Sequence, residues 1–277
     1  MPGVDAASVL QDIAIMRQTA EAAGRLAAEK RARQEIQVWE KSAGHPVSEA
    51  DMAANALILE HLRAARPGYG WLSEETADDP SDRAAQRVWV VDPIDGTKAF
   101  LRGGADWCVG IALVEHGQVV AGVVHVPDVG ETYEAWAGGG AFRNGQPLAV
   151  SDCGAICGCK MIASRMLVDH PGWADPWPDM ALAAPRPNAT LLRMAHVAAG
   201  QQDATMALWR KSDWDLAAGT ILIEEAGGIV TDHRGKPFEF NQTVPAQQSL
   251  VAAGKALHPL LLERTRAVRL PDPQDLR

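Results

Sequence analysis

The chain has 277 residues, of which 47% are hydrophobic and 22% are charged, and its formal net charge is −9 at pH 7. Such a length suits one large or two ordinary globular domains, and the apolar share is enough to fill a substantial core. The acidic balance argues against binding to nucleic acid polymers, because a surface that contacts their phosphate backbone needs clustered Lys and Arg.

The sequence shows no targeting or membrane-spanning signal. Its first residues, Met1-Pro2-Gly3-Val4-Asp5, lack the basic and apolar regions of a secretory signal. No later stretch approaches the roughly 18 apolar residues that a bilayer-spanning helix needs. We therefore expect a cytoplasmic protein with no membrane partner.

Two helices are expected at the beginning of the chain. Residues 5–33 are rich in Ala, Leu, Glu, Arg and Gln, with apolar residues at helical spacing, which predicts a long amphipathic helix. After a break at Pro46, Ser48 is a typical N-cap for a second helix over residues 49–65. Asp51 lies in the first turn of that helix, where an acid commonly complements the helix dipole.

Two short apolar strands are each followed by acids. A Trp-Leu pair leads into Glu74 and Glu75, and the apolar run of residues 88–91 leads into Asp92 and, three positions later, Asp95. The run has the length and β-branched content of a buried strand. The pattern therefore places carboxylates at two strand ends that are close in sequence.

The residues after Asp92 predict a turn and a short helix. Pro93 lacks an N–H and cannot continue a central strand, and Gly96 permits a turn that a Cβ would obstruct. Thr97 then begins a short helix whose free N–H groups would face an anion at its end. Carboxylates beside such a cradle suggest a divalent metal that bridges to phosphate.

The middle of the chain alternates apolar and polar residues, which predicts an antiparallel meander. Its expected strands cover residues 108–115, 118–126 and 131–137, with a closing strand over residues 147–150. The glycines at 138–140 lack the Lys-Ser/Thr of a nucleotide-binding loop, so tight turn packing explains them better.

The second half mixes strands and helices after a small-residue junction at 151–158. The expected strands cover residues 160–164, 204–208, 229–231 and 249–253, and the expected helices cover residues 190–198, 215–226 and 259–268. We divide the chain into an N-terminal α+β subdomain, residues 1–152, and a C-terminal α/β subdomain, residues 153–277. Asp215 lies at the start of the second of these helices.

Three of the four cysteines, Cys153, Cys157 and Cys159, cluster within seven positions at and just after the junction. A zinc site would need a fourth ligand at a regular spacing, and the sequence offers only Cys108 or a remote histidine. Small buried or loop thiols explain the cluster better than a metal or redox role.

Five acids have contexts that favour a metal site: Asp51, Glu74, Asp92, Asp95 and Asp215. Each alone has an ordinary explanation in solvation, turn capping or N-capping. Acids that follow apolar strands are nevertheless costly to bury unless a metal or hydrogen-bond donors compensate them. The pattern is consistent both with a Mg²⁺ site and with several solvated acids.

Three motifs resemble the signatures of the inositol monophosphatase superfamily of Mg²⁺-dependent, often Li⁺-sensitive phosphomonoesterases. In chain order they are Leu72-Ser73-Glu74-Glu75, Asp92-Pro93-Ile94-Asp95-Gly96-Thr97 and Trp214-Asp215-Leu216-Ala217-Ala218-Gly219. The similarity extends over about residues 9–253, and the central motif is highly specific. The resemblance implies an α/β (α+β) fold, a layered α/β/α/β/α sandwich of two subdomains.

The resemblance also implies a ligand set for two or three Mg²⁺ ions. Glu74, Asp92 and the backbone carbonyl of Ile94 would hold one ion, while Asp92, Asp95 and Asp215 would hold a second. Paired metals of this kind activate a water and stabilise both the attacking and the leaving oxygen of phosphoryl transfer.

Further roles follow from the resemblance. Asp51 would partner Thr97 to orient the attacking water, and Glu75 would hold or deprotonate a water farther out. The N–H groups of Gly96 and Thr97 would bind phosphate oxygens. Lys41 matches a position on the mobile metal-binding loop of the family, although a solvated lysine explains it almost as well.

The expected substrate-binding residues are Gly96, Thr97, Lys98, Arg193 and Asp215. Arg193 replaces a lysine that is frequent in the family at its helix. The preceding Ala189-Thr190-Leu191 stands where the family often has Gly-Ser-Ala, which leaves the substrate contacts there open.

The choice of phosphate ester depends on residues beside the motifs. Inositol-specific members usually follow the central motif with Thr-Asn-Phe, whereas this chain has Lys98-Ala99-Phe100, which resembles bisphosphate nucleotidases and histidinol phosphatases. We favour adenosine 3′,5′-bisphosphate, with inositol 1-phosphate and histidinol phosphate as alternatives. Trp209-Arg210-Lys211 is a candidate contact for a base or a second phosphate, with packing as the plain explanation for Trp209.

Two further expectations concern the protein as a whole. A catalytically silent, metal-stabilised binding or scaffold protein is the alternative from another functional class. The intact set of acids with Thr97 disfavours that alternative, because a silent protein has no chemical reason to keep them together. A homodimer is expected from the resemblance only.

Overall fold

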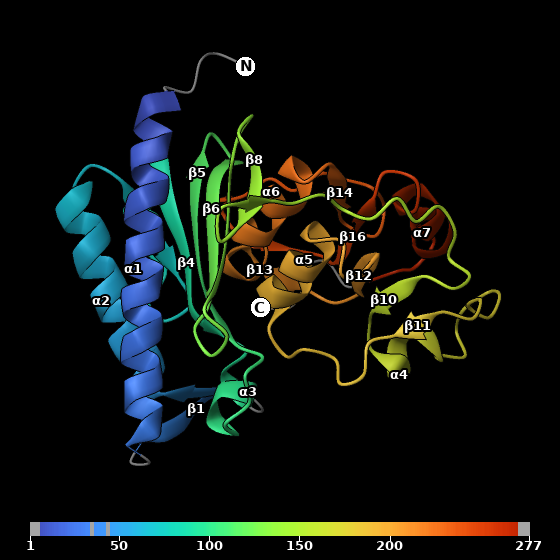
Figure 1. Ribbon diagram of the computed structural model, residues 1–277, viewed down its shortest axis with the longest axis horizontal. Coiled ribbons are helices and arrows are strands. Elements are labelled where there is room, and N and C mark those ends of the chain that lie inside the picture. The colour runs from blue at the N-terminus through green and yellow to red at the C-terminus, as the bar shows by residue number, and fades with distance from the viewer. Residues whose placement is uncertain (1–5, 34–35, 43–44, 271–277) are drawn as a thin grey trace.

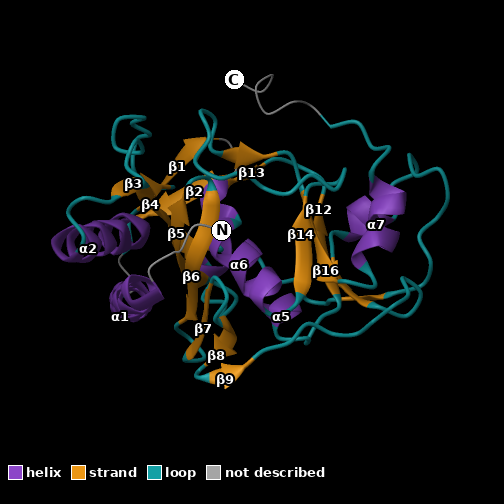
Figure 2. Ribbon diagram, turned by 90° about the horizontal axis from the view of Figure 1, so that it is seen from above, coloured by secondary structure: helices purple, strands orange, loops and turns teal. Residues whose placement is uncertain are grey.

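A computed structural model of the chain describes residues 6–33, 36–42 and 45–270. Its elements form five layers, in the order helices, sheet, helices, sheet, helix (Figures 1 and 2). The helices are α1 (Ala6–Ala32), α2 (Glu49–Ala65), α3 (Thr97–Leu101), α4 (Arg165–Val168), α5 (Thr190–Ala198), the 3₁₀ turn η1 (Asp213–Asp215), α6 (Ala217–Glu225) and α7 (His258–Thr265).

The larger sheet has seven strands in their sequence order. They are β3 (Gly70–Ser73), β4 (Arg87–Asp95), β5 (Cys108–Glu115), β6 (Gln118–Val126), β7 (Glu131–Trp136), β8 (Gly140–Arg143) and β9 (Gln146–Pro147). Only β3 and β4 pair in parallel, and every later pair is antiparallel. The predicted meander is therefore confirmed, although its last strand ends at Pro147.

The smaller sheet has five strands in the order β11-β10-β12-β16-β14. They are β10 (Lys160–Ile162), β11 (Ala181–Leu182), β12 (Ala204–Ala207), β14 (Gly228–Thr231) and β16 (Leu250–Gly254). Two short ribbons complete the set, with β1 (Val38–Ser42) against β2 (His45–Ser48) and β13 (Lys211–Ser212) against β15 (Ala246–Gln247). The boundary at residues 152 and 153 stays a prediction.

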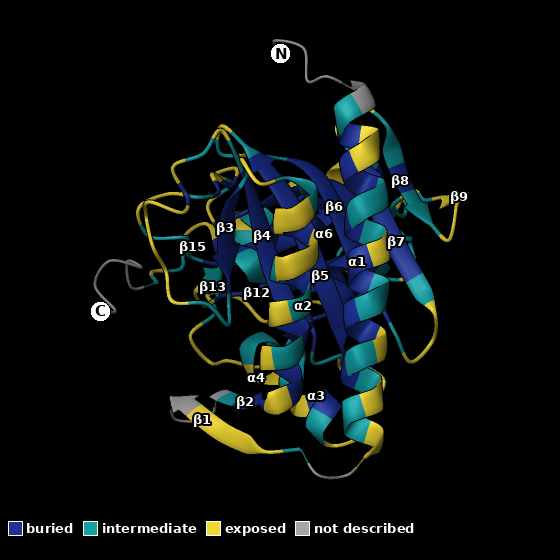
Figure 3. Cartoon of the chain, turned by 90° about the vertical axis from the view of Figure 1, so that its left-hand side faces the viewer, coloured by how far each residue is buried: buried dark blue, intermediate teal, exposed yellow. Residues whose placement is uncertain are grey.

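Helices cover both sheets and fill the space between them. α1 and α2 lie side by side on the outer face of the larger sheet (Figure 3), and Met16 and Ile58 are among the residues by which they pack against it. α5 and α6 lie between the two sheets, and α7 lies beyond the smaller sheet (Figure 2). The central strands read as continuous apolar runs because both faces of each sheet are covered.

Three apolar cores correspond to this layering. Met16, Ile58 and Ile111 belong to the core under α1 and α2, whereas Leu191 and Ile221 belong to the core between the sheets. A third core lies under α7. None of the described helices is long and apolar enough to cross a membrane.

The helix bounds that the sequence predicts agree closely with the structure in three cases. Ser48 caps α2 as predicted, and its hydroxyl accepts a hydrogen bond from the backbone N–H of Ala50. α5 has the predicted bounds, and α1 differs from its prediction by one residue at each end.

The prediction that strand gives way to turn at Pro93 is wrong, because β4 continues through Pro93 to Asp95. Two features of the pairing allow this. β3 no longer pairs with β4 beyond Val91, and the β4–β5 register is irregular between Asp92 and Asp95. The missing N–H of Pro93 therefore leaves no ladder hydrogen bond unmade.

Candidate active site

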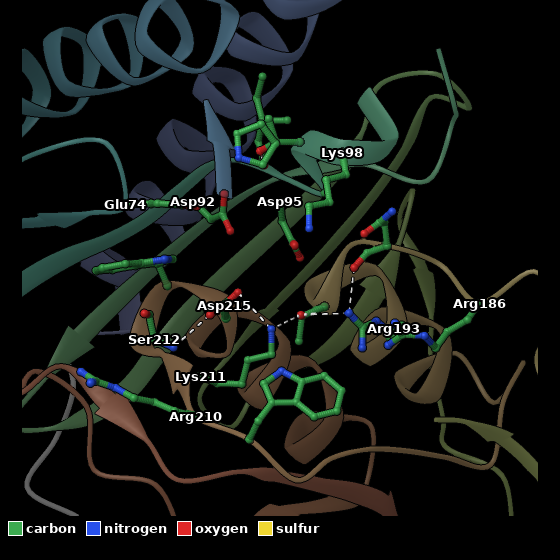
Figure 4. Close-up of a pocket in the computed structure, with 18 residues that line it drawn as sticks. Glu74, Asp92, Asp95, Lys98, Arg186, Arg193, Arg210, Lys211, Ser212 and Asp215 are labelled. Carbon is green, nitrogen blue, oxygen red and sulfur yellow. Dashed lines mark hydrogen bonds and ion pairs between the residues drawn. The ribbon is translucent and has the colours of Figure 1, made fainter. Parts of the chain in front are cut away.

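A pocket of about 600 Å³ opens where β4 ends, between the larger sheet and the elements that precede α5 and α6 (Figure 4). Its lining includes four carboxylates, from Glu74, Asp92, Asp95 and Asp215, and five cationic side chains, from Lys98, Arg186, Arg193, Arg210 and Lys211. Groups of opposite charge thus face one space, which suits a ligand set that contains both metal ions and anions.

Three of these acids converge. One oxygen atom each of Asp92, Asp95 and Asp215 lies within 4.8 Å of the others, although Asp215 comes from η1 and the other two come from β4. Asp92 is 1% exposed, and its buried Oδ1 atom has no hydrogen-bond partner among the residues that the structure describes. Buried carboxylate oxygens that lack donors are costly, and an oxygen-seeking cation such as Mg²⁺ would compensate them.

Crowding and burial raise the pKa values of Asp92 and Asp95. Burial, followed by the charges of Glu74 and Asp95, holds the pKa of Asp92 well above its ordinary value. Burial and the charge of Asp215 raise the pKa of Asp95 to about 6. Both shifts mean that the folded protein disfavours the charged carboxylates unless a positive charge joins them.

Asp215 is held in place by its own turn. Its Oδ2 atom accepts a hydrogen bond of 2.9 Å from the backbone N–H of Ser212, as part of a capping box at η1. Its Oδ1 atom lies 3.4 Å from the ammonium of Lys211. The neighbouring Asp213 is buried and ties the turn to a distant loop, because it accepts a hydrogen bond from the N–H of Asn241.

A hydrogen-bonded chain joins α2 to the end of β4. The Oγ1 atom of Thr97 lies 3.1 Å from both Oδ1 of Asp51 and the carbonyl oxygen of Ile94. The backbone N–H and the hydroxyl of Ser48 donate to the other oxygen of Asp51. Burial nevertheless raises the pKa of Asp51. Asp51 is therefore a fixed, desolvated acceptor directly behind the Thr97 hydroxyl.

The segment between Asp95 and Thr97 is tightly constrained. Asp95 accepts a hydrogen bond of 2.5 Å from the backbone N–H of Leu191 in α5. Gly96 has a φ of 93°, and a Cβ there would come within 2.8 Å of the carbonyl oxygen of Asp106. Only glycine fits this turn without strain, which explains why the chain reverses here into α3.

Most predicted site residues meet in this pocket. Glu74, Ile94, Gly96 and Lys98 line it together with the converging acids. The predicted substrate contact Arg193 lies on its wall and is 3% exposed.

Three other predicted residues stand apart from the lining. Asp51 is reached through Thr97, and Glu75 is half-buried next to Glu74 but does not line the pocket. The side chain of Lys41 lies outside the residues that the structure describes.

The structure adds residues that sequence reasoning had not assigned to the site. Arg186, Asn188 and Ser212 line the pocket, and Thr190, noted only for its departure from the family pattern, lies among its cations. The N-terminal position of Thr190 on α5 was the one available signal. No motif pointed to Arg186, which lies in an irregular segment.

The cysteines do not form a metal site in the described part of the chain. The group of side chains able to hold a metal there consists of Asp92, Asp95 and Asp215 alone. All four cysteines are free, and Cys108 and Cys159 are buried. That the clustered cysteines are plain thiols stays a prediction.

Comparison with known proteins identifies the relatives of this chain. The profile of the inositol monophosphatase family matches residues 9–270. The chain belongs to the inositol monophosphatase family. An inositol-1-monophosphatase of Mesorhizobium japonicum is 38% identical over 248 residues, which cover 86% of this chain and 88% of the relative. A histidinol-phosphatase of Chlorobaculum parvum is 33% identical, over 89% of this chain and 93% of its own length.

A solved structure supports the same assignment. The extragenic suppressor protein SuhB of Bartonella henselae superposes with a TM-score of 0.79 and 29% identity, covering 94% of this chain and 100% of that protein. The expected family and fold are therefore confirmed for this inositol monophosphatase family member. The bisphosphate nucleotidase branch finds no support among these relatives. The family is generally metal-dependent, in agreement with the three converging acids.

Proposed function

We propose that this protein hydrolyses phosphate monoesters of small metabolites with Mg²⁺ as its metal. Family membership makes it a phosphoric monoester hydrolase, since its relatives carry the names of phosphatases. The observation that carries the proposal is the convergence of Asp92, Asp95 and Asp215 at a pocket that cationic side chains also line. Among the described residues, one buried oxygen of Asp92 has no hydrogen-bond partner. Carboxylate oxygens suit Mg²⁺, and the cations suit a phosphate ester.

The same residues suggest how two ions would be held. Glu74, Asp92 and the carbonyl of Ile94 would hold one ion, and Asp92, Asp95 and Asp215 would hold another, with room for a third. Bound Mg²⁺ would lower the pKa of a water and withdraw charge from the phosphate oxygens. Glu75, directly after Glu74, would accept a hydrogen bond from water at the edge of this group.

The chain's own groups would move the proton. Thr97 has one hydroxyl proton and two acceptors at 3.1 Å, in Asp51 and the Ile94 carbonyl. When that proton points to Asp51, a lone pair of the hydroxyl is free to accept a proton from the attacking water. Asp51 would then act as the general base through Thr97, and its desolvation makes it more basic.

The phosphate would lie at the start of α3. Its oxygens would meet the N–H groups of Gly96 and Thr97 and the ammonium of Lys98, while Arg193, farther along the pocket wall, would contact another part of the substrate (Figure 4). Asp215 would contact both an ion and the ester. These donors are placed before the reaction begins, so they need no reorganisation as charge develops.

Among esters, adenosine 3′,5′-bisphosphate stays our favoured substrate. Lys98 and Trp209 both line the pocket, in agreement with a nucleotide that carries a second phosphate. The names of two relatives favour inositol 1-phosphate and histidinol phosphate as the alternatives.

A phosphate-release assay tests the proposal. Purified protein is given adenosine 3′,5′-bisphosphate, inositol 1-phosphate, histidinol phosphate and fructose 1,6-bisphosphate, each with Mg²⁺ and with EDTA. We expect Mg²⁺-dependent release that Li⁺ inhibits and that Asp95→Asn abolishes. Absence of release from all four esters, with Asp95→Asn no different from the wild type, would instead favour a silent binding protein. Fastest turnover of inositol 1-phosphate would overturn the substrate preference alone.

A further inference from the structure

We propose that Lys211, Thr190 and Arg193, with Arg186 at their outer edge, form a subsite for a second anionic group on the substrate. The preferred esters would then be those whose leaving alcohol itself carries a phosphate, sulfate or carboxylate. This inference rests on the proposed function, because it concerns the alcohol of the ester hydrolysed in the same pocket.

The hydrogen bonds around Thr190 show a site built for an acceptor. Its Oγ1 atom accepts hydrogen bonds from Nζ of Lys211 at 2.8 Å and from Nη2 of Arg193 at 3.2 Å. A hydroxyl has two lone pairs and one proton, so both lone pairs are engaged. The proton has no acceptor among the described residues. Thr190 is thus a donor flanked by two cations, an arrangement that an anionic ligand would complete.

Arg193 carries a positive charge that the protein leaves incompletely paired. Its Nε and Nη2 atoms donate to the carbonyl oxygens of Ala189 and Asn188, but its buried Nη1 atom has no hydrogen-bond partner within residues 6–33, 36–42 and 45–270. No ion pair of Arg193 occurs in the described part of the chain. Burial and the nearby Arg186 lower its pKa to about 10, so the guanidinium remains charged at neutral pH. Such a charge is costly to bury unless an anion approaches it.

These cations occupy one side of the pocket. In Figure 4, Arg193 and Arg186 lie on the side away from Asp92, and Lys211 lies between them and Asp215. Metal ions on the four carboxylates would compensate those acids. Lys211, Arg193 and Arg186 would then leave a positively charged wall facing the substrate. A single phosphate ester brings at most two negative charges, so the cationic wall is matched better by a substrate with a second anion.

The competing explanation for these cationic side chains is that they only neutralise the acids, since Lys211 lies 3.4 Å from Asp215. The two explanations differ in what they predict for selectivity. If the cations only balance the acids, their removal affects all esters alike. If they bind a second anion, their removal affects only esters that have one.

A matched pair of substrates separates these outcomes. Adenosine 3′,5′-bisphosphate and adenosine 3′-monophosphate share the scissile ester and differ only in the 5′-phosphate. Fructose 1,6-bisphosphate and fructose 1-phosphate form a second pair in case the base does not fit. Within a pair, we expect the wild-type kcat/KM to be at least about tenfold higher for the ester that carries the second anion. One hydrogen bond to a charged group stabilises a bound ligand enough to give such a ratio.

Two variants locate the effect. Lys211→Met and Arg186→Met each keep an unbranched apolar stem, and each should reduce the kcat/KM ratio within a pair by at least about fivefold. The exposed Lys255 lies outside the pocket lining, so Lys255→Met should leave the ratio unchanged. Arg193→Lys keeps the positive charge but removes the planar guanidinium, so it tests whether the geometry of that group contributes to binding of the second anion. If that variant fails to fold, the first two decide the question.

The outcomes distinguish this inference from the proposed function. Equal kcat/KM within both pairs, or a ratio that neither Lys211→Met nor Arg186→Met changes, overturns the subsite while leaving the phosphatase intact. If no ester is hydrolysed, the proposed function fails, and sulfate binding to EDTA-treated protein decides the subsite by calorimetry. Binding of one sulfate, weakened at least about fivefold by Lys211→Met, supports the subsite, whereas equal or absent binding overturns it.

Discussion

At the scale of single residues, the Thr97 hydroxyl links the acid-bearing strand to a helix on the other side of the turn. It lies between Asp51 and the carbonyl of Ile94, and no other described side chain bonds to its oxygen. Thr97 itself provides no carboxylate to a metal. Its removal should therefore affect the reaction of water more than the binding of Mg²⁺.

We expect Thr97→Ala to lower kcat by about 10²- to 10⁴-fold, the usual contribution of a positioned proton acceptor. Mg²⁺ affinity, measured by calorimetry, should change little. Thr97→Ser keeps the hydroxyl and should recover most of the loss. A variant that loses Mg²⁺ affinity in proportion to kcat would show that Thr97 acts on the metal instead.

Replacement of Asp92, in contrast, should weaken the binding of Mg²⁺. Asp92 is the acid that we propose as a ligand of both ions, and its Oδ1 atom has no hydrogen-bond partner in the described part of the chain. Asp92→Asn should weaken Mg²⁺ binding by at least about tenfold in calorimetry, because an amide oxygen is a poorer ligand than a carboxylate. Asp152→Asn, at an exposed acid outside the pocket lining, serves as the matched control. Unchanged affinity in Asp92→Asn would contradict the shared-ligand assignment.

At the scale of elements, the N-terminus of α2 has two roles at once. Ser48 and Asp51 form a capping box, in which the Ser48 hydroxyl and N–H both donate to Asp51. The same bonds leave the other oxygen of Asp51 directed at Thr97. The same hydrogen bonds cap the helix and orient Asp51, the proposed general base, so a change at the cap should affect both stability and kcat.

Ser48→Ala should lower the free energy of unfolding by about 1 kcal/mol, as measured in urea, and should also lower kcat. Ser48→Gly provides the comparison, because glycine is tolerated at N-caps and costs only a few tenths of a kcal/mol. Both variants lose the hydroxyl that holds Asp51, so both should lose kcat. If kcat followed stability rather than the hydroxyl, the coupling would be refuted.

Much of this architecture can be predicted from the sequence, because the patterns that indicate it involve residues close together in the chain. The cap at Ser48 and the helix over 190–198 depend on neighbouring residues, and both were predicted correctly. The acids of β4 were found from a motif in which every member lies within six positions. Local patterns of this kind need no knowledge of the tertiary fold.

The errors and omissions depend on contacts between distant segments. Whether Pro93 ends a strand depends on where β3 stops pairing, which the β4 sequence does not reveal. The contact between Lys211 and Thr190 joins residues 21 positions apart, and Arg186 reaches the pocket from an irregular segment. Tertiary placement, rather than propensity, decides such features.

At the scale of the whole molecule, the acids are brought together by the packing of different layers. Asp92 and Asp95 arrive on the larger sheet, and Asp215 arrives on the turn before α6, which packs between the sheets. The raised pKa values of Asp92 and Asp95 show that the folded chain brings these groups together at a cost. Without a bound cation, the repulsion among these acids is expected to lower the stability of the folded chain, as is common at functional sites.

This cost predicts a reversal of stability that depends on the metal. At pH 7.5 in EDTA, Asp92→Asn should be more stable to urea than the wild type, because the neutral amide ends the repulsion with Glu74 and Asp95. With Mg²⁺ at a hundred times its Kd, the wild type should gain about 2.7 kcal/mol, whereas the variant gains much less. The order of stability would then invert.

The pH dependence provides a second test of the same argument. A carboxyl whose pKa is raised by folding binds more protons in the folded state, so its cost is complete above the raised pKa and shrinks as the pH falls from there toward the ordinary value of 3.8. The pKa of Asp95 is about 6 and that of Asp92 is also raised. In EDTA, the advantage of Asp92→Asn should therefore shrink as the pH is lowered from 7.5 to 5, because the wild type takes up protons on folding in this range. An advantage that stays constant between pH 5 and 7.5 would place its origin in packing rather than in charge.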